Sequence, residues 1–399
     1  MQSWPRRSIG DLLKKVSKPV EVIADREYRQ IGIRSHCKGI FHKAPTTGKA
    51  MGSKRVFWVE SGCFVVNIVF AWEQAIAMTT DSERGMIASH RFPMYRSSNG
   101  QLLPEYAHLY FSSPRGKYDL GIASPGGAGR NKTLGQDEFK RLKMPVPPIE
   151  HQRLAINVVT LWSQAIGQML KLIEANRQLK KGLMHQLFTT KERFAGFSGK
   201  WVPSSLGDLG KFSKGAGVSK AEAVPEGLPA VRYGELYTAH HVVIKRFQTR
   251  ISPESARSSR RIHQGDIVIA GSGETPEDIG KAAAFLDDFE AYAGGDTIIF
   301  SPNKQKADSL FLSYLLNSGI VRRFIQSRAQ GQSVVHLYRK DLEPLPLKIP
   351  HLTEQRKIAG ALAAVDREIE TLESCVDNLK NQKRGLTQKL LAGSLKVKP

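Results

Sequence analysis

The chain repeats itself at a shift of 203 residues, and this duplication constrains the fold more than any other feature of the sequence. Residues 147–153 read PPIEHQR and residues 350–356 read PHLTEQR. Farther along each half, residues 180–188 read KKGLMHQLF and residues 383–391 read KRGLTQKLL. Self-similarity at a fixed period indicates one structural unit that occurs more than once. The 399 residues are therefore predicted to be two copies of a module of about 200 residues, and not two unrelated domains.

The two copies also begin alike, because SIGDLL starts at Ser8 and SLGDLG at Ser205, each four residues after a tryptophan. Strand-like runs follow in each copy, and a proline-free segment with helical periodicity closes it. We expect an α+β fold of two tandem mixed domains, each followed by a long helix. The expected boundaries are 1–146 for the first mixed domain, 147–192 for the first helix, 193–349 for a linker and the second mixed domain, and 350–399 for the second helix and its tail.

Within the mixed domains, the strand candidates are apolar runs bounded by turn residues. In the first domain they are residues 55–59, 63–70, 75–78 and 92–95, and in the second domain they are residues 266–270 and 297–300. Helices are expected at residues 102–112 and 309–326.

The closing segment of each copy has the alternating three- and four-residue spacing of a coiled-coil seam. The seam of the first copy consists of Val159, Trp162, Ile166, Met169, Ile173, Asn176, Lys180, Leu183 and Leu187. The shift of 203 places the second seam at Leu362, Val365, Ile369, Leu372, Val376, Leu379, Lys383, Leu386 and Leu390. A lysine interrupts both seams at the same register, and a polar group at a core position can fix how helices pair.

We expect the two long helices to pack antiparallel, because a duplicated unit that turns back on itself restores a pseudo-twofold relation between its copies. The alternative is two independent amphipathic helices, each lying on its own domain. A helix of about 40 residues is roughly 60 Å long. That length exceeds one turn of B-DNA, about 34 Å, so such helices could hold two domains over separate half-sites.

The chain is strongly basic, with 59 Lys and Arg against 37 Asp and Glu, a net charge of +22. The first mixed domain has 23 basic and 12 acidic residues, a net +11, and residues 199–349 have 20 and 16, a net +4. Such an excess favours a polyanionic partner, either nucleic acid or an anionic membrane surface. No stretch approaches the roughly 20 apolar residues of a membrane span. The three cysteines, Cys37, Cys63 and Cys375, form no paired framework, which favours the reducing cytoplasm.

Catalytic patterns are not evident in the sequence. The phosphate-binding pattern G-x-x-x-x-G-K-[ST] does not occur, so the sequence does not support ATP binding by such a loop. Glu138 and Lys140 have a spacing found in nucleases, but Glu138 is better placed in the first turn of a helix, where an acid is favourable. His240 and His241 have no second pair of metal ligands in range. We therefore expect no catalytic residue, no metal site and no cofactor of the chain's own.

Recognition of nucleic acid is then the main hypothesis. Loops that combine glycine with basic or amide side chains can approach a phosphate backbone and reach base edges. Candidates in the first domain are Lys43, Lys49, Lys54, Arg55, Arg91, Arg130, Asn131 and Lys132. Candidates in the second domain are Lys214, Arg232, Arg257, Arg260, Arg261, Ser272, Gln332, Ser333 and His336.

Taken together, these features resemble a known family. Each copy opens with a tryptophan and an [IL]GD string, continues to a proline-rich string ending in QR, and closes with a helix ending in K[KR]GL. This duplicated order, with the linker RFAGFSGKW at residues 193–201, is similar to the specificity subunit of type I restriction-modification systems. His151 stands where the family has an acid in its EQR string.

The resemblance implies two target-recognition domains, each reading one half of a split, asymmetric DNA site, with the paired helices setting the gap. It also implies two methyltransferase (modification) subunits docked on the chain and, through them, restriction subunits driven by ATP. S-adenosylmethionine, ATP and Mg would be bound by those partners. Leucines outside the first seam would either offer a partner surface or pack against the chain's own domains, namely Leu161, Leu170, Leu172 and Leu179.

Two other classes of function stay open at this point. One is a non-catalytic coiled-coil scaffold that binds nucleic acid through phosphates alone. The other is a self-contained DNA methyltransferase or nuclease, which the missing patterns disfavour.

Overall fold

The computed structural model describes residues 4–52, 54–126, 132–275, 277–331 and 334–395. The chain divides into two compact units, one formed by Met1–Leu170 with Ser374–Pro399 and the other by Lys171–Glu373. Two long helices, α6 (Ile149–Phe188) and α12 (Leu352–Leu391), each contribute one half to each unit. None of the described helices is long and apolar enough to cross a membrane.

The first unit is built around a four-stranded antiparallel sheet in the order β2-β11-β8-β9. These strands are Leu13–Val16, Met94–Ser97, Phe64–Val66 and Ile76–Met78. Three two-stranded ribbons extend from it: β3 with β6 (Glu27–Tyr28, Thr46–Thr47), β4 with β5 (Ile31–Ile33, Ile40–His42) and β7 with β10 (Val56–Trp58, Ile87–Ser89). A further pair, β1 and β12 (Arg6–Ser8, Lys143–Pro145), joins the two ends of the mixed domain.

Short helices complete the first unit and build its core. They are α1 (Ile9–Leu12), α2 (Gly48–Met51), α3 (Pro104–Phe111), α4 (Pro114–Ile122) and α5 (Gln136–Arg141), with single 3-10 turns at Ala71–Glu73 and Asp81–Glu83. Aromatic contacts lock α3 and α5 against the sheet: Phe111 stacks on Phe64 at 5.7 Å and contacts Phe139 at 5.5 Å, measured between ring centroids. Glu138 lies in the first turn of α5, as its proposed interaction with the helix dipole predicts.

The second unit repeats this topology. Its first sheet has the order β14-β22-β18-β20, with strands Gly210–Lys214, Thr297–Pro302, Ile267–Ala270 and Ala282–Ala284. In both units the first strand of this sheet pairs with the last, and the last pairs with the second. The pair β13 and β24 (Val202–Ser205, Pro346–Ile349) closes the second mixed domain as β1 and β12 close the first.

A second four-stranded sheet, in the order β16-β15-β21-β17, enlarges this unit. Its strands are Thr249–Ile251, Ala223–Val231, Ala291–Ala293 and Arg260–Ile262, and a small ribbon joins β19 (Ser272–Gly273) to β23 (Val335–His336). The helices are α7 (Glu235–Thr238), α8 (Pro253–Ser258), α9 (Ser309–Leu316), α10 (Gly319–Ser327) and α11 (Arg339–Leu342), with 3-10 turns at Leu206–Leu209 and Lys220–Glu222.

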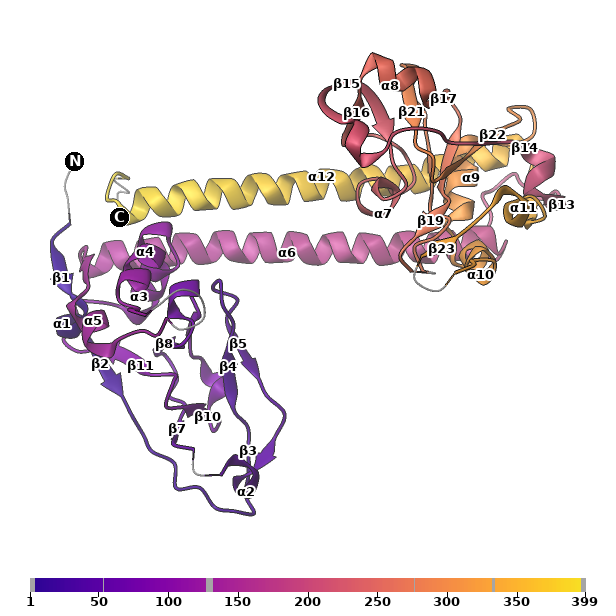
Figure 1. Cartoon of the computed structure of the whole chain (residues 1–399). Coiled ribbons are helices and arrows are strands. Elements are labelled where there is room, and N and C mark those ends of the chain that lie inside the picture. The colour runs from indigo at the N-terminus through magenta and orange to yellow at the C-terminus, as the bar shows by residue number, and fades with distance from the viewer. Residues whose placement is uncertain (1–3, 53, 127–131, 276, 332–333, 396–399) are drawn as a thin grey trace. The chain divides into compact units, whose positions relative to one another are not determined.

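The expected antiparallel packing of the long helices is confirmed (Figure 1). In the first unit, Leu390 and Leu391 near the end of α12 join the apolar cluster that contains Ala155 near the start of α6. In the second unit the order is reversed, because Leu187 near the end of α6 shares a cluster with Ile358 near the start of α12. The mixed helix-and-sheet class predicted from the sequence is confirmed as well.

Two of the expected elements were too long. The helix expected at residues 309–326 is two helices, because Asn317 turns its side chain onto Ala282 and Ser318 has an extended backbone before α10 begins. The strand expected at residues 63–70 ends at Val66, because the side-chain oxygen of Asn67 accepts a hydrogen bond from the amide of Val69 and starts a turn.

Candidate nucleic-acid interface

In the first unit, one end of the β7–β10 ribbon carries a group of exposed basic residues. Lys54 and Arg55 precede β7, and Arg91 follows β10. The amide of His90 donates to the carbonyl of Arg55 at 3.2 Å, which places the two chain ends side by side. The ribbon therefore brings together three candidates that lie up to 37 positions apart in the sequence.

The other candidates of this domain are not brought together by any described contact. Lys43 follows β5 and Lys49 lies on α2, and both are exposed. Lys132 is half-buried, with its ammonium 5.8 Å from the ring centroid of Trp72, a cation–π distance. Arg130 and Asn131 lie outside the described residues.

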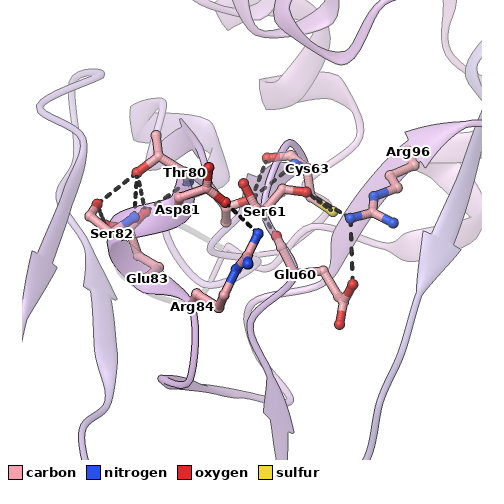
Figure 2. A network of polar contacts seen from close by, with 10 residues as sticks. Glu60, Ser61, Cys63, Thr80, Asp81, Ser82, Glu83, Arg84 and Arg96 are labelled. Carbon is pink, nitrogen blue, oxygen red and sulfur yellow. Dashed lines mark hydrogen bonds and ion pairs between the residues drawn. The ribbon is translucent and has the colours of Figure 1, made fainter.

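A polar network stiffens the base of these ribbons (Figure 2). Arg96 on β11 donates to the carbonyl of Ser61 at 2.7 Å and lies 3.4 Å from Glu60, which pairs with Lys18 at 2.7 Å. The hydrogen bond from Lys18, together with the positive charges nearby, lowers the pKa of Glu60. The network therefore holds the loop that follows β7 against the sheet.

Glu83 anchors a second point of this network. Its carboxylate accepts from the amide and hydroxyl of Thr80, both at 2.8 Å, and pairs with the imidazole of His42 at 2.8 Å. Burial alone would raise the pKa of Glu83, but hydrogen bonds from His42, Ser82 and Thr80 outweigh burial and lower the pKa to about 2. An ionised carboxylate therefore ties the end of the β4–β5 ribbon to the turn at residues 81–83.

In the second unit, basic residues gather along the edge strand β17. Arg260 and Arg261 on this strand are exposed, and Arg257 ends the preceding helix α8. The guanidinium of Arg260 donates to the carbonyl of Lys214 at 3.2 Å, which brings that candidate to the same edge. β17 is the edge strand of its sheet, and the amide of Arg260 donates to the carbonyl of Ala216 at 3.2 Å, so the exposed side chains of Arg257 and Arg261, and not free backbone, are what this edge offers a partner.

Arg232 is engaged inside the domain instead. Its guanidinium donates to the hydroxyl of Thr249 at 3.0 Å and lies 3.6 Å from Glu235, whose side chain is buried. Burial opposes ionisation of Glu235, yet the imidazole of His240, 3.7 Å away, and the hydrogen bonds that the carboxylate accepts from Thr249 and the amide of Gln248 leave its pKa lowered. Arg232 therefore helps to neutralise a buried carboxylate.

The β19–β23 ribbon brings two further candidates together. The hydroxyl of Ser272 and Nδ1 of His336 are 3.1 Å apart. Gln332 and Ser333, on the approach to β23, lie outside the described residues. Tyr338 is not among the residues predicted from the sequence; it is 49% exposed and stacks near His336 at 6.4 Å between ring centroids. Its signal is a tyrosine two positions after His336 and directly before two basic residues, Arg339 and Lys340. The ammonium of Lys340 lies 5.8 Å from the centroid of the Tyr338 ring.

The residues predicted for the helix seam are all buried or half-buried: Trp162, Ile166, Met169, Ile173, Leu183, Leu187, Val365, Ile369, Leu372, Val376, Leu386 and Leu390. The two seam lysines have different surroundings. Lys180 binds both carboxylate oxygens of Asp366, at 2.6 and 2.8 Å, and Tyr314 donates to the same carboxylate at 2.6 Å. Burial lowers the pKa of Lys383.

The described part of the chain contains no cluster of three or more His, Cys, Asp or Glu side chains that could hold a metal ion. The candidate interface thus consists of basic, hydroxyl and aromatic side chains on strand edges and ribbon ends. Such side chains can position a phosphate backbone and read base edges.

Residues 198–380 match the family described as the Type I restriction modification DNA specificity domain. The chain is 25% identical over 288 residues to a putative type I restriction enzyme specificity subunit, MjaX, of Methanocaldococcus jannaschii, covering 68% of this chain and 63% of the relative. It is 24% identical over 279 residues to the MjaVIII specificity subunit of the same organism, covering 65% of this chain and 64% of the relative. The chain thus spans less than two thirds of the length of these relatives.

Solved structures share the fold over nearly the whole chain. A structure from work on complex assembly and conformational transition of the type I R-M system has a TM-score of 0.63 at 16% identity, covering 99% of both chains. The type I S subunit from M. genitalium has a TM-score of 0.60 at 15% identity, covering 97% of this chain and 96% of the other. The match over residues 198–380 and the specificity subunits among the relatives confirm the resemblance to type I restriction-modification specificity subunits that the sequence shows.

Proposed function

We propose that this protein is the non-catalytic subunit that selects the DNA site of a type I restriction-modification enzyme. Each mixed domain would read one half of a bipartite, asymmetric duplex site. The observation that carries the proposal is the duplication, since one sheet topology occurs in both units and each copy presents basic side chains on strand edges or ribbon ends. Two equivalent readers in one chain match a site with two halves.

The reading surfaces would be the basic end of the β7–β10 ribbon in the first unit and the β17 edge with the β19–β23 ribbon in the second. Arginine side chains there can contact phosphates or pair with guanine in the major groove, and the half-buried His336 adds an imidazole that the buried Ser272, only 5% exposed, would orient from within the domain. Lys43, Lys49 and Lys132 would add phosphate contacts in the first unit. The first mixed domain, at +11, would depend more on phosphate contacts than the second, at +4.

The long helices would set the gap between the half-sites and dock two modification subunits. A 40-residue helix is about 60 Å long. Outside its seam, α6 exposes Leu161 by 65%, Leu170 by 47%, Leu172 by 47% and Leu179 by 52%. Exposed leucines along a helix are a suitable surface for a partner. The modification subunits would bind S-adenosylmethionine and methylate adenine, and restriction subunits attached through them would use ATP and Mg.

The test is a map of modified adenines in cells that express the chain with its modification subunit. We expect one bipartite motif, which disappears when the chain is deleted. Inserting four residues into α6 between Leu170 and Asn176 should change the gap and leave both halves unaltered. Modification that persists without the chain, or an insertion that changes a half-site at constant gap, would contradict the proposal.

Side-chain changes locate the readers within the same map. Replacing both Arg260 and Arg261 with alanine should relax or abolish one half of the motif, since a lost base contact costs about 1–3 kcal/mol of discrimination. Replacing Arg55 and Arg91 should affect the other half. Arg367→Ala, which removes an exposed charge from α12, is the control and should leave the motif intact.

A further inference from the structure

A buried glutamine joins each mixed domain to the start of a long helix. In the first unit this residue is Gln152, in the first turn of α6, with 0% of its surface exposed. Its side-chain oxygen accepts from the amide of Leu103 at 2.9 Å, and its nitrogen donates to the carbonyl of Gln101 at 2.8 Å. The same nitrogen donates to the carbonyl of Pro147 at 2.8 Å.

The second unit repeats this arrangement atom for atom. Gln355, in the first turn of α12, is also 0% exposed. Its oxygen accepts from the amide of Asp308 at 2.9 Å, and its nitrogen donates to the carbonyls of Lys306 at 3.0 Å and Pro350 at 2.9 Å. In both units the clamped backbone spans three residues, and its last residue is the N-cap of a core helix, α3 or α9.

Only glutamine makes these three bonds at this reach. The amide supplies two donors and an acceptor in one plane, so it pairs with a peptide segment as a neighbouring strand would. An ionised glutamate has no donor and would face two carbonyl oxygens with a buried charge, while asparagine is one methylene shorter. The contacts join residues 47 to 51 positions apart, so they are tertiary contacts and not local caps.

We propose that Gln152 and Gln355 are positioning residues that set the angle at which each recognition domain leaves its long helix, and thereby which gap between half-sites the protein accepts. This inference rests on the proposed function. Neither glutamine contacts DNA in it, because both are fully buried. Gln152 acts through α3, whose Phe111 packs on Phe64 in the main sheet of the first unit. Gln355 acts through α9, whose Phe311 packs on Phe188 at the end of α6.

Hydrogen exchange of the purified full chain tests the clamp without reference to DNA. Gln152→Glu should speed amide exchange about ten-fold in the peptide covering residues 101–107 and leave residues 306–312 unchanged. Gln355→Glu should do the reverse, so each variant is the other's control. Gln168→Glu, an exposed change on α6, should alter neither peptide. If a glutamate variant does not fold, Gln→Met, which keeps the length without hydrogen bonds, takes its place.

The gap is read from the map of modified adenines made with the same variants. We expect both half-sites to be retained and more than one gap length to be modified. A single wild-type gap in a variant whose exchange has increased would overturn the positioning role, and so would wild-type exchange. Failure of the proposed function would appear separately, as a wild-type chain whose deletion leaves the modified motif unchanged.

Discussion

Glu354 and His151 occupy equivalent positions in the two copies and have different partners. Arg193, from the linker after α6, donates to both oxygens of Glu354 at 2.9 and 2.7 Å. His151 instead lies 5.2 Å from the ring of Trp4. The histidine that departs from the family's EQR string thus belongs to an aromatic junction, whereas the acid belongs to an ion pair. The equivalent starts of α6 and α12 are therefore stabilised by different interactions, an aromatic contact in the first and an ion pair in the second.

At the same scale, Glu83 makes the first unit sensitive to acid. Its folded-state pKa of about 2 lies below the ordinary value of 4.5. A lowered pKa contributes stability that is complete above pH 4.5 and is lost as the pH falls toward 2. We expect urea unfolding to show wild type more stable than Glu83→Gln at pH 6, with a difference that shrinks between pH 4.5 and 3. A difference that stays constant over this range would contradict the assignment.

At the scale of elements, the register of α6 against α12 is marked by a half-buried ion pair in the second unit, Lys180 with Asp366. Asp366 receives Lys180 from α6 and Tyr314 from α9, so three helices meet at one carboxylate, and a more exposed pair joins Arg177 of α6 to Glu373 of α12 at 2.6 Å. Burial, and then the hydrogen bond to Asp366, raise the pKa of Tyr314, which keeps its phenol a donor. The Asp366 carboxylate thus links the pairing of the long helices to the position of α9.

Removing this carboxylate should be costly. Asp366→Asn leaves Lys180, only 18% exposed, without its charged partner, and we expect a loss of about 2 kcal/mol in the free energy of unfolding. The matched control is Glu370→Gln, one turn away, which breaks the exposed Lys245–Glu370 pair and should cost less than about 1 kcal/mol. Denaturant titration of both variants measures the difference, and equal losses would show that the burial of the first pair is unimportant.

The long helices and their pairing could be predicted because the residues of each helix themselves carry the signal, namely the three- and four-residue spacing of the seam and its repetition at a shift of 203. Side-chain hydrogen bonds of Asn67 and Asn317 end the strand β8 and the helix α9. The partner of Asn317, Ala282, lies 35 positions away in the sequence, so a local sequence pattern cannot predict this helix end. Among the candidates, Arg261 and Arg232 are both arginines, but Arg261 is exposed whereas Arg232 pairs with the buried Glu235. Gln152 and Gln355 belong to the repeated QR string, but most of the backbone groups that they bind lie 47 to 51 positions earlier in the sequence, so these hydrogen bonds could not be predicted from the string.

At the scale of the whole molecule, the duplication is visible in topology and uneven in detail. Both units share the order of their main sheet and the closing strand pair, while the second adds a four-stranded sheet. Positive charge is concentrated in the first mixed domain, at +11 against +4. Two units with one architecture and different surfaces are what the proposed asymmetric site requires, because each copy can then bind a different half of the site.

The two units also differ in how the chain supplies them. The second is one continuous stretch, Lys171–Glu373, whereas the first needs Met1–Leu170 and then Ser374–Pro399. Leu391 joins the first unit's core, and Gly393 lies so close to Trp4 that an added Cβ would approach the indole nitrogen to 2.5 Å. A chain ending at residue 373 should therefore resist limited proteolysis in the second unit and be cleaved in the first.

During synthesis, all residues of the second unit leave the ribosome before the segment from Ser374 onward, which the first unit needs to complete its core. Domains generally fold as units as they emerge, N-terminal parts first. Here that order is reversed in one respect, because the domain translated first is the one completed last. The first unit cannot complete its core until the second half of α12, from Ser374 onward, has been synthesised.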